Sequence, residues 1–194
     1  MGGVVHPCFL LIARGLHCVI FARHFSNGMS ITRSTSGSTQ KHATSQRAPV
    51  ILVHCDYTPN SSPLRVRQFL PGEVDELLKH RVAFYNFWKP LKGSVEEKPL
   101  AMCDATSSTD EDFLTMKLRY RDRDGETFVL RHSPRHHWWY FPHMTEDQAI
   151  LLKTYDSETD GRARFIGHSA FDDPDTPLNA PMRESIEIST AAFF

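Results

Sequence analysis

A histidine and an aspartate separated by one residue, His54 and Asp56, follow the short apolar run 50–53. The run is rich in β-branched residues and predicts a strand, in which residues i and i+2 project from the same face. An imidazole and a carboxylate can therefore converge on one metal ion. A third ligand, His168, ends the late strand-like segment 163–168. Two histidines and one carboxylate on one face of an octahedron leave three positions open, which is typical of Fe(II) enzymes that bind a co-substrate and O₂ together.

The second feature is Arg183 with Ser185, at the start of the last strand-like segment. Because the chain has 11 histidines, an H-x-D pattern alone is weak evidence for a metal site. Arg183 and Ser185 face the same side of an extended chain. A guanidinium fork beside a hydroxyl suits the distal carboxylate of 2-oxoglutarate. A solvated charge on an edge strand is the alternative for Arg183, but the order H-x-D, His, R-x-S favours a co-substrate anchor.

Aromatic residues are candidates for a substrate pocket, because amphipathic rings suit mostly apolar metabolites. We assign Trp88, Trp138 and Tyr140 to this pocket, with a plain core role as the alternative for each. Four further histidines lie around this aromatic run, namely His132, His136, His137 and His143. They leave a zinc-dependent hydrolase on a cupin-like barrel as an alternative, although their spacings match no zinc-ligand pattern.

The elements that must position these residues are mostly short strands. Beyond the first strand, the sequence predicts a turn-rich loop from Pro59 to Pro63. It then predicts one helix over 71–80, with proline at its start, acids in its first turn and bases in its last. Strand-like segments separated by Pro, Gly, Asp and Asn clusters cover 82–88, 100–103, 127–131, 138–141, 150–155, 163–168 and 185–194. Many short strands with one clear helix predict a mainly β protein, an antiparallel sandwich or barrel.

Composition narrows the class of protein. The chain has 194 residues and 40% hydrophobic residues, which fits one globular domain. Residues 51–194 carry 17 basic and 23 acidic residues, and this acidic balance argues against a nucleic-acid partner. The four cysteines show no paired spacing, which suits a reducing compartment such as the cytoplasm. Dinucleotide-binding, P-loop and serine-hydrolase motifs have no match.

The segment 1–48 differs from the rest. Its first 22 residues are apolar but are interrupted by His6, Arg14 and His17, so no stretch reaches the roughly 18–20 apolar residues that span a bilayer. Residues 23–48 are rich in Ser, Thr and basic residues without any acid, which predicts disorder. Mitochondrial targeting is one interpretation of this composition, and a non-native stretch from a gene-model error is another. We therefore predict an oxygenase-like domain over 49–194.

Seven segments resemble the fungal hydroxylase/desaturase family of secondary-metabolite clusters, proteins described as gibberellin-desaturase-like or as similar to the cephamycin methoxylase subunit. They are VHCDY (53–57), NFWKPL (86–91), PLAMCDA (99–105), WWYFP (138–142), DGRARF (160–165), HSAFDDP (168–174) and PMRESIE (181–187). The resemblance implies a double-stranded β-helix, a jelly-roll or cupin-like barrel with few helices. It implies hydroxylation or desaturation of a small metabolite with Fe(II), 2-oxoglutarate and O₂. His54, Asp56, His168 and Arg183 fall on the family's matching positions.

The sequence departs from this family before the H-x-D strand, where family members carry ordered chain and this one carries 1–48. The departure suggests a truncated N-terminal part, an uncovered flank and a protein partner that covers it. A catalytically silent barrel that acts as an accessory subunit of a biosynthetic enzyme is therefore the alternative function.

Overall fold

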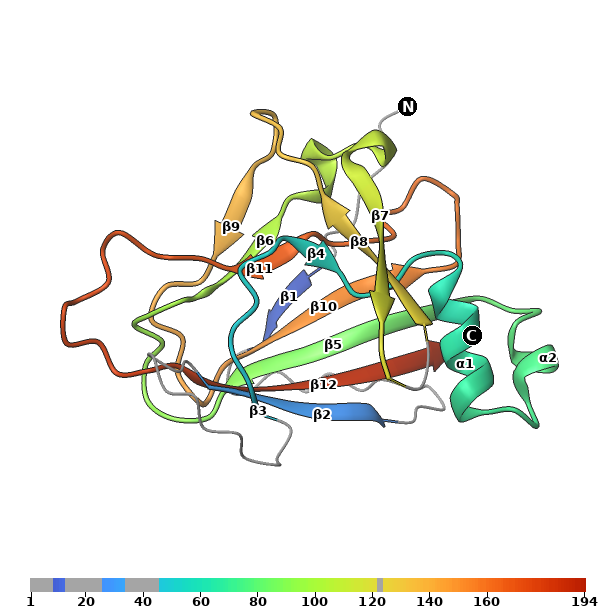
Figure 1. Ribbon diagram of the computed structural model, residues 1–194, viewed down its shortest axis with the longest axis horizontal. Coiled ribbons are helices and arrows are strands. Elements are labelled where there is room, and N and C mark those ends of the chain that lie inside the picture. The colour runs from blue at the N-terminus through green and yellow to red at the C-terminus, as the bar shows by residue number, and fades with distance from the viewer. Residues whose placement is uncertain (1–8, 13–25, 34–45, 122–123) are drawn as a thin grey trace.

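Two sheets facing each other form the protein, as seen in a computed structural model that describes residues 9–12, 26–33, 46–121 and 124–194 (Figure 1). The major sheet, the lower one in Figure 1, has the order β1 (Phe9–Ile12), β10 (Ala149–Asp156), β5 (Val82–Pro90), β12 (Glu184–Phe193), β2 (Ser26–Arg33), β3 (Gln46–Arg47). The minor sheet above it has the order β7 (Phe113–Arg119), β8 (Asp124–Leu130), β4 (His54–Cys55), β11 (His168–Ala170), β6 (Leu100–Cys103), β9 (Trp138–Tyr140).

Neighbouring strands in both sheets run antiparallel, except that β2 and β3 are parallel. The predicted mainly β, double-stranded β-helix architecture is thus confirmed. Expected strands correspond to β5, β6, β8, β9, β10 and β12, while β7 was not predicted. The expected strand over 163–168 was wrong for most of its length, because β11 begins only at His168. The expected strand over 50–53 was also wrong, because β4 begins only at His54.

Alternation along β5 shows which side faces the other sheet. Phe84, Asn86 and Trp88 are almost fully buried, whereas Tyr85 and Phe87 between them are half-buried. This period of two is that of a strand with one face on the core. Trp88 belongs to a buried cluster with Met102, Ile150 and Leu152 among others. Phe84 belongs to a second cluster, nearer the helices, with Tyr57, Val66 and Tyr155 among others.

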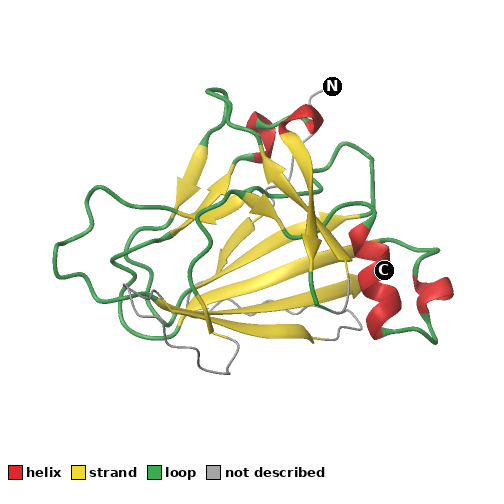
Figure 2. Ribbon diagram, in the orientation of Figure 1, coloured by secondary structure: helices red, strands yellow, loops and turns green. Residues whose placement is uncertain are grey.

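Helices α1 and α2 lie together at one end of the sandwich, while short helical turns lie at the top of the view (Figure 2). Helix α1 spans Ser61–Phe69, and α2 is a single turn over Val74–Leu77. The expected helix over 71–80 was therefore mostly wrong, and α1 lies where a loop was expected. Pro63 is tolerated because it sits in the first turn of α1, where its missing N–H needs no helical partner. Short 3₁₀ turns occupy Ala105–Ser107 and Asp110–Asp112.

Part of the segment 1–48 forms strands in the structure. β2 pairs with β12 from Glu184↔Arg33 to Thr190↔Ser26, and β1 pairs with β10. Of these strands, β2 lies in the stretch 23–48 for which disorder was expected, and the chain is extended there instead, since an edge of the major sheet offers backbone donors and acceptors to any extended chain. The rest of that segment lies outside the described residues, and a domain boundary near residue 49 stays a prediction. No helix in the described ranges has the length and apolar character needed to cross a membrane.

A buried ion pair closes the end of β10. Asp156 is fully buried and accepts from Arg81 through Nε at 3.0 Å and Nη2 at 2.7 Å, and from Lys153 Nζ at 3.2 Å. Burial alone would raise the pKa of the Asp156 carboxyl, but these cations and the backbone N–H of Glu158 hold it below its usual range. A depressed folded-state pKa adds stability above the unfolded-state pKa of about 3.9, and this stability is lost as the pH falls through the folded-state pKa.

We therefore expect Asp156→Asn to lower the Tm at neutral pH and to flatten its acid dependence. Thermal unfolding of the parent and of this variant from about pH 7 to about pH 3 measures both effects. The exposed Asp110, as Asp110→Asn, is the matched control and should follow the parent curve. An Asp156→Asn curve parallel to that of the parent would contradict the assignment.

Candidate metal and co-substrate site

The register of the minor sheet brings the three expected metal ligands together. His54 on β4 and His168 on β11 are directly paired across antiparallel strands, and their rings lie 4.5 Å apart. Asp56 follows β4, with Oδ1 3.7 Å from His54 Nε2 and Oδ2 3.8 Å from His168 Nε2. The three ligand atoms lie within 4.8 Å of one another, a spread that a single ion with ligand distances near 2 Å can close by small side-chain shifts.

Backbone carbonyls orient both rings. His54 Nδ1 lies 2.8 Å from the carbonyl oxygen of Leu52, and His168 Nδ1 lies 3.1 Å from that of Ile166. A carbonyl only accepts, so each Nδ1 carries the proton and each neutral ring keeps a lone pair on Nε2. Metal-ligating histidines are commonly held by such a bond on the other ring nitrogen.

Burial keeps His168 ready to act as a ligand. Its side chain is 4% exposed, against 20% for His54 and 24% for Asp56. Desolvation lowers the pKa of the His168 imidazole, outweighing the opposite effect of Asp56, and the neighbouring His54 lowers it further. His168 is therefore neutral at physiological pH, as a metal ligand must be.

Gly167 lets β11 lie close to its neighbours. A Cβ at this position would come within 2.9 Å of Leu130 Cδ2 and within 3.5 Å of Cys103 Cβ. Glycine therefore permits a close approach that fixes His168 opposite His54, as expected for glycine where two chain segments crowd.

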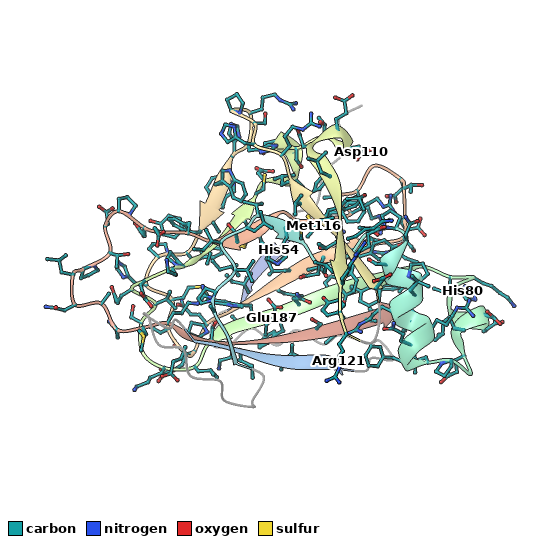
Figure 3. The ribbon with its side chains drawn as sticks, viewed as in Figure 1. His54, His80, Asp110, Met116, Arg121 and Glu187 are labelled. Atoms are coloured by element: carbon teal, nitrogen blue, oxygen red, sulfur yellow. The ribbon has the colours of Figure 1, made fainter. Side chains whose placement is uncertain are left out.

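Asn86, which was not singled out from the sequence, contacts the triad from the opposite sheet. Asn86 on β5, in the opposite sheet, donates from Nδ2 to Asp56 Oδ2 at 2.8 Å and is fully buried. Its place in the middle of an apolar strand was the only signal available, because a polar residue on a core face is unusual. Figure 3 shows His54 in the middle of the molecule, with Glu187 of β12 below it in this view.

The two expected anchor residues lie on the inner side of the major sheet. Arg183 is 6% exposed and Ser185 is fully buried. Arg183 Nη1 donates to the carbonyl oxygen of Lys98, while Arg183 Nε and Ser185 Oγ are buried and have no hydrogen-bond partner within the described part of the chain. Burial lowers the pKa of the Arg183 guanidinium to about 10, against the raising effects of Glu97 and Glu187. The guanidinium therefore remains charged, with bonding capacity to spare.

Trp88 connects the two groups of residues. It follows Asn86 by one pleat of β5, and the Arg183 guanidinium lies 5.5 Å from its ring centroid. Its ring is 3% exposed and belongs to the core. The structure thus places Trp88 beneath the anchor, in a cation–π contact, rather than in an open pocket.

The other two aromatic candidates face away from the triad. On the edge strand β9, Trp138 pairs with Cys103 and Tyr140 with Ala101, whereas Trp139 pairs with Met102, which in turn pairs with His168. Directly paired residues share a face of the sheet. Trp139, 55% exposed, is therefore on the same face as His168, and Trp138 and Tyr140 are on the opposite one.

The surplus histidines do not form a second site. Among the residues that the structure describes, His54, Asp56 and His168 are the one group able to hold a metal ion. His136 lies 3.3 Å from Asp112, and His143 lies 3.1 Å from Glu96. Each of these two histidines therefore lies beside a carboxylate and not in a cluster of histidines, and the zinc-hydrolase alternative has no support among the described residues around Trp138.

The residues present fit iron and 2-oxoglutarate. Two neutral imidazoles and one carboxylate suit a first-row metal and leave further positions open. The orphaned Arg183 Nε and Ser185 Oγ fit a carboxylate, since buried polar atoms without partners are rare and indicate a missing ligand or water.

Comparison with known proteins gives matches over most of the chain. A family model described as "Oxidoreductase/YMDC permease-like domain" matches residues 17–193. The chain is 36% identical over 140 residues to aspirochlorine biosynthesis protein N of Aspergillus oryzae, covering 71% of this chain and 58% of that protein. It is 35% identical over 158 residues to hydroxylase/desaturase efuI of Hormonema carpetanum, covering 76% and 52%.

Among solved structures, the iron and alpha-ketoglutarate-dependent endoperoxidase NvfI superposes with a TM-score of 0.79 at 25% identity, covering 88% of this chain and 62% of that one. The chain spans a little over half the length of the curated relatives, 58% of the first and 52% of the second.

Proposed function

Since the chain belongs to the hydroxylase/desaturase family of fungal non-haem iron, 2-oxoglutarate-dependent oxygenases, we propose that it hydroxylates or desaturates a small secondary metabolite. His54, Asp56 and His168 hold Fe(II) in this proposal. Arg183 and Ser185 bind the distal carboxylate of 2-oxoglutarate. The observation that carries the proposal is the convergence of the three ligand atoms within 4.8 Å. It is supported by the buried Arg183 guanidinium just before β12, whose Nε has no partner among the described residues.

Each residue then has a defined task. When bound, iron and 2-oxoglutarate would supply the oxidising power, with O₂ and 2-oxoglutarate consumed and succinate and CO₂ released. One oxygen atom of O₂ enters succinate, and the other either becomes the hydroxyl group of the metabolite or leaves as water with the two hydrogen atoms that the metabolite loses. The carbonyls of Leu52 and Ile166 keep the Nε2 lone pairs of His54 and His168 directed at the centre. Arg183 fixes one end of the co-substrate, and the apolar ring of Trp88 beneath it excludes water.

The substrate is proposed to approach from the β9 side of the minor sheet. Trp139 is the large exposed aromatic on the His168 face of that edge, and an exposed indole suits an apolar small molecule. We propose a cytoplasmic location, which is supported by the lack of paired cysteine spacing in the sequence. The protein partner expected from the sequence stays a prediction. Measuring the mass of the complex that contains this chain in solution tests it.

Metal loading and co-substrate turnover test the proposed function. The purified full chain, loaded anaerobically with Fe(II) and then given O₂ and 2-oxoglutarate, should release succinate. Chelation should stop this reaction, Fe(II) should restore it, and Zn²⁺ should not. 2-Oxoglutarate at about 100 times its Kd should stabilise the Mn²⁺-loaded chain by about 2.7 kcal/mol. A chain that binds metal but neither binds nor consumes 2-oxoglutarate would contradict the proposal.

A further inference from the structure

The orientation of the Asn86 side chain is set by its partner. Asp56 Oδ2, 2.8 Å from Asn86 Nδ2, belongs to a carboxylate that can only accept a hydrogen bond. The amide nitrogen therefore faces Asp56, and the amide oxygen faces away. That oxygen, Oδ1, is buried without a hydrogen-bond partner among the described residues. The amide of Asn86 thus makes one hydrogen bond to the triad through Nδ2, while Oδ1 accepts none from the described residues.

An apolar residue would suit this position better for folding alone. The inner-face neighbours of Asn86 along β5 are Phe84 and Trp88, and its cross-strand partners are Leu152 on β10 and Ser189 on β12. Ser189 does not donate to Asn86 Oδ1, which has no partner among the described residues. A buried carbonyl oxygen without a donor destabilises the folded state, and replacing such a group with an apolar one of similar shape is often neutral. Packing therefore gives no reason for an amide here, whereas the bond to Asp56 does.

We infer that Asn86 is a positioning residue for the proposed metal site, one that holds the Asp56 carboxylate in place between the two imidazoles. This inference rests on the proposed function. Asp56 Oδ1 lies 3.7 Å from His54 Nε2 and Oδ2 lies 3.8 Å from His168 Nε2, so the carboxylate lies between both histidine ligands. Asp56 follows β4, which ends at Cys55, so strand pairing does not fix its side chain. The bond from Asn86 Nδ2 to Asp56 Oδ2 fixes the carboxylate from the opposite sheet.

The substitution Asn86→Leu tests this role, with Thr154→Val as the matched control. Thr154 is also fully buried in the major sheet, and its Oγ1 donates to the carbonyl oxygen of Phe84 at 3.4 Å. Both changes replace a buried polar side chain with an apolar one of similar size, but only Asn86 touches the triad. Co²⁺ binding to the metal-free full chain is measured by calorimetry, the Co²⁺ visible spectrum reports the coordination of the ion, and the Tm of the metal-free protein reports stability.

We expect Asn86→Leu to weaken Co²⁺ binding by about 10–100-fold, the usual loss when a group behind a metal ligand is removed. Its Co²⁺ spectrum should change, and 2-oxoglutarate should bind the Co²⁺-loaded variant more weakly. Thr154→Val should keep the parent's Co²⁺ affinity and spectrum. The Tm of metal-free Asn86→Leu should fall no further than that of Thr154→Val.

Parent-like Co²⁺ affinity and spectrum in a folded Asn86→Leu protein would overturn the inference while leaving the proposed function intact. Failure of the parent chain itself to bind Co²⁺ would overturn both. Should Asn86→Leu misfold, Asn86→Ala is compared with Thr154→Ala in the same assays. If neither Asn86 variant folds while Thr154→Ala does, Asn86 is required for folding and the positioning role is overturned.

Discussion

The substitution His168→Ala is expected to abolish both metal binding and the release of succinate from 2-oxoglutarate. His168 is the most buried member of the triad and one of only two imidazoles in it. Removing it leaves His54 and Asp56, too few ligands to hold Fe(II) against water. The loss should exceed the about 10–100-fold that follows removal of a group behind a ligand. Calorimetric titration with Co²⁺ and succinate release under Fe(II) measure the two effects.

His136→Ala is the matched control for this experiment. The His136 side chain is 2% exposed and pairs with Asp112, so its removal also deletes a buried imidazole beside a carboxylate. It should lower the free energy of unfolding by about 1–3 kcal/mol, as expected for a disrupted buried polar pair, and leave metal binding at the parent level. Equal metal affinity in His168→Ala and His136→Ala would show that the triad is not the metal site.

The convergence of His54 and Asp56 was predictable from their spacing, because residues i and i+2 of an extended chain project from the same face. His54 and Asp56 stand two residues apart after an apolar run, and the period of two places both on one face. Pairing of His54 with His168 was not visible in the sequence, since register depends on contacts between distant strands. The order of the motifs could only suggest that the third ligand comes from a late strand.

The aromatic run shows where sequence reasoning reached its limit. Trp138, Trp139 and Tyr140 are consecutive and all large, so no alternation of polar and apolar residues reveals which of them faces the triad. A shift of one residue in a strand moves a side chain to the other face of the sheet. The sequence analysis assigned Trp138 and Tyr140 to the substrate pocket, whereas the strand register places Trp139 on the face of His168.

Asn86 and the helices were missed for different reasons. A single asparagine in a strand carries no motif, and its role depends on Asp56 in the opposite sheet. Helix α1 was read as a loop because Pro59 and Pro63 are common turn residues, although proline also suits the first turn of a helix. Pro71 was taken as a helix start, but it follows Leu70, whose backbone has already left the helical region where α1 ends.

The arrangement of charges around Arg183 leads to the second large effect. Glu97 and Glu187 both favour its charged form, yet Nε has no partner among the described residues. Nη1 of the guanidinium donates to the carbonyl oxygen of Lys98, and Cζ lies 5.5 Å from the centroid of the Trp88 ring. A planar, prepositioned fork loses little freedom on binding a carboxylate, whereas a lysine ammonium would reach the same point as a mobile single charge.

Arg183→Lys is therefore expected to weaken 2-oxoglutarate binding by about 10–150-fold, the equivalent of about 1.5–3 kcal/mol for a hydrogen bond to a charged group. Co²⁺ affinity should not change, because Arg183 belongs to the opposite sheet from the triad. Ser185→Ala should cost less, about 2–12-fold, as expected for a neutral hydroxyl that contributes about 0.5–1.5 kcal/mol. Calorimetry with 2-oxoglutarate on the Mn²⁺-loaded protein measures both losses.

Arg81→Lys is the control, because it alters a guanidinium that is paired with Asp156 instead. It should lower the Tm and leave 2-oxoglutarate binding unchanged. Parent-like affinity for 2-oxoglutarate in Arg183→Lys would show that the co-substrate carboxylate is bound elsewhere.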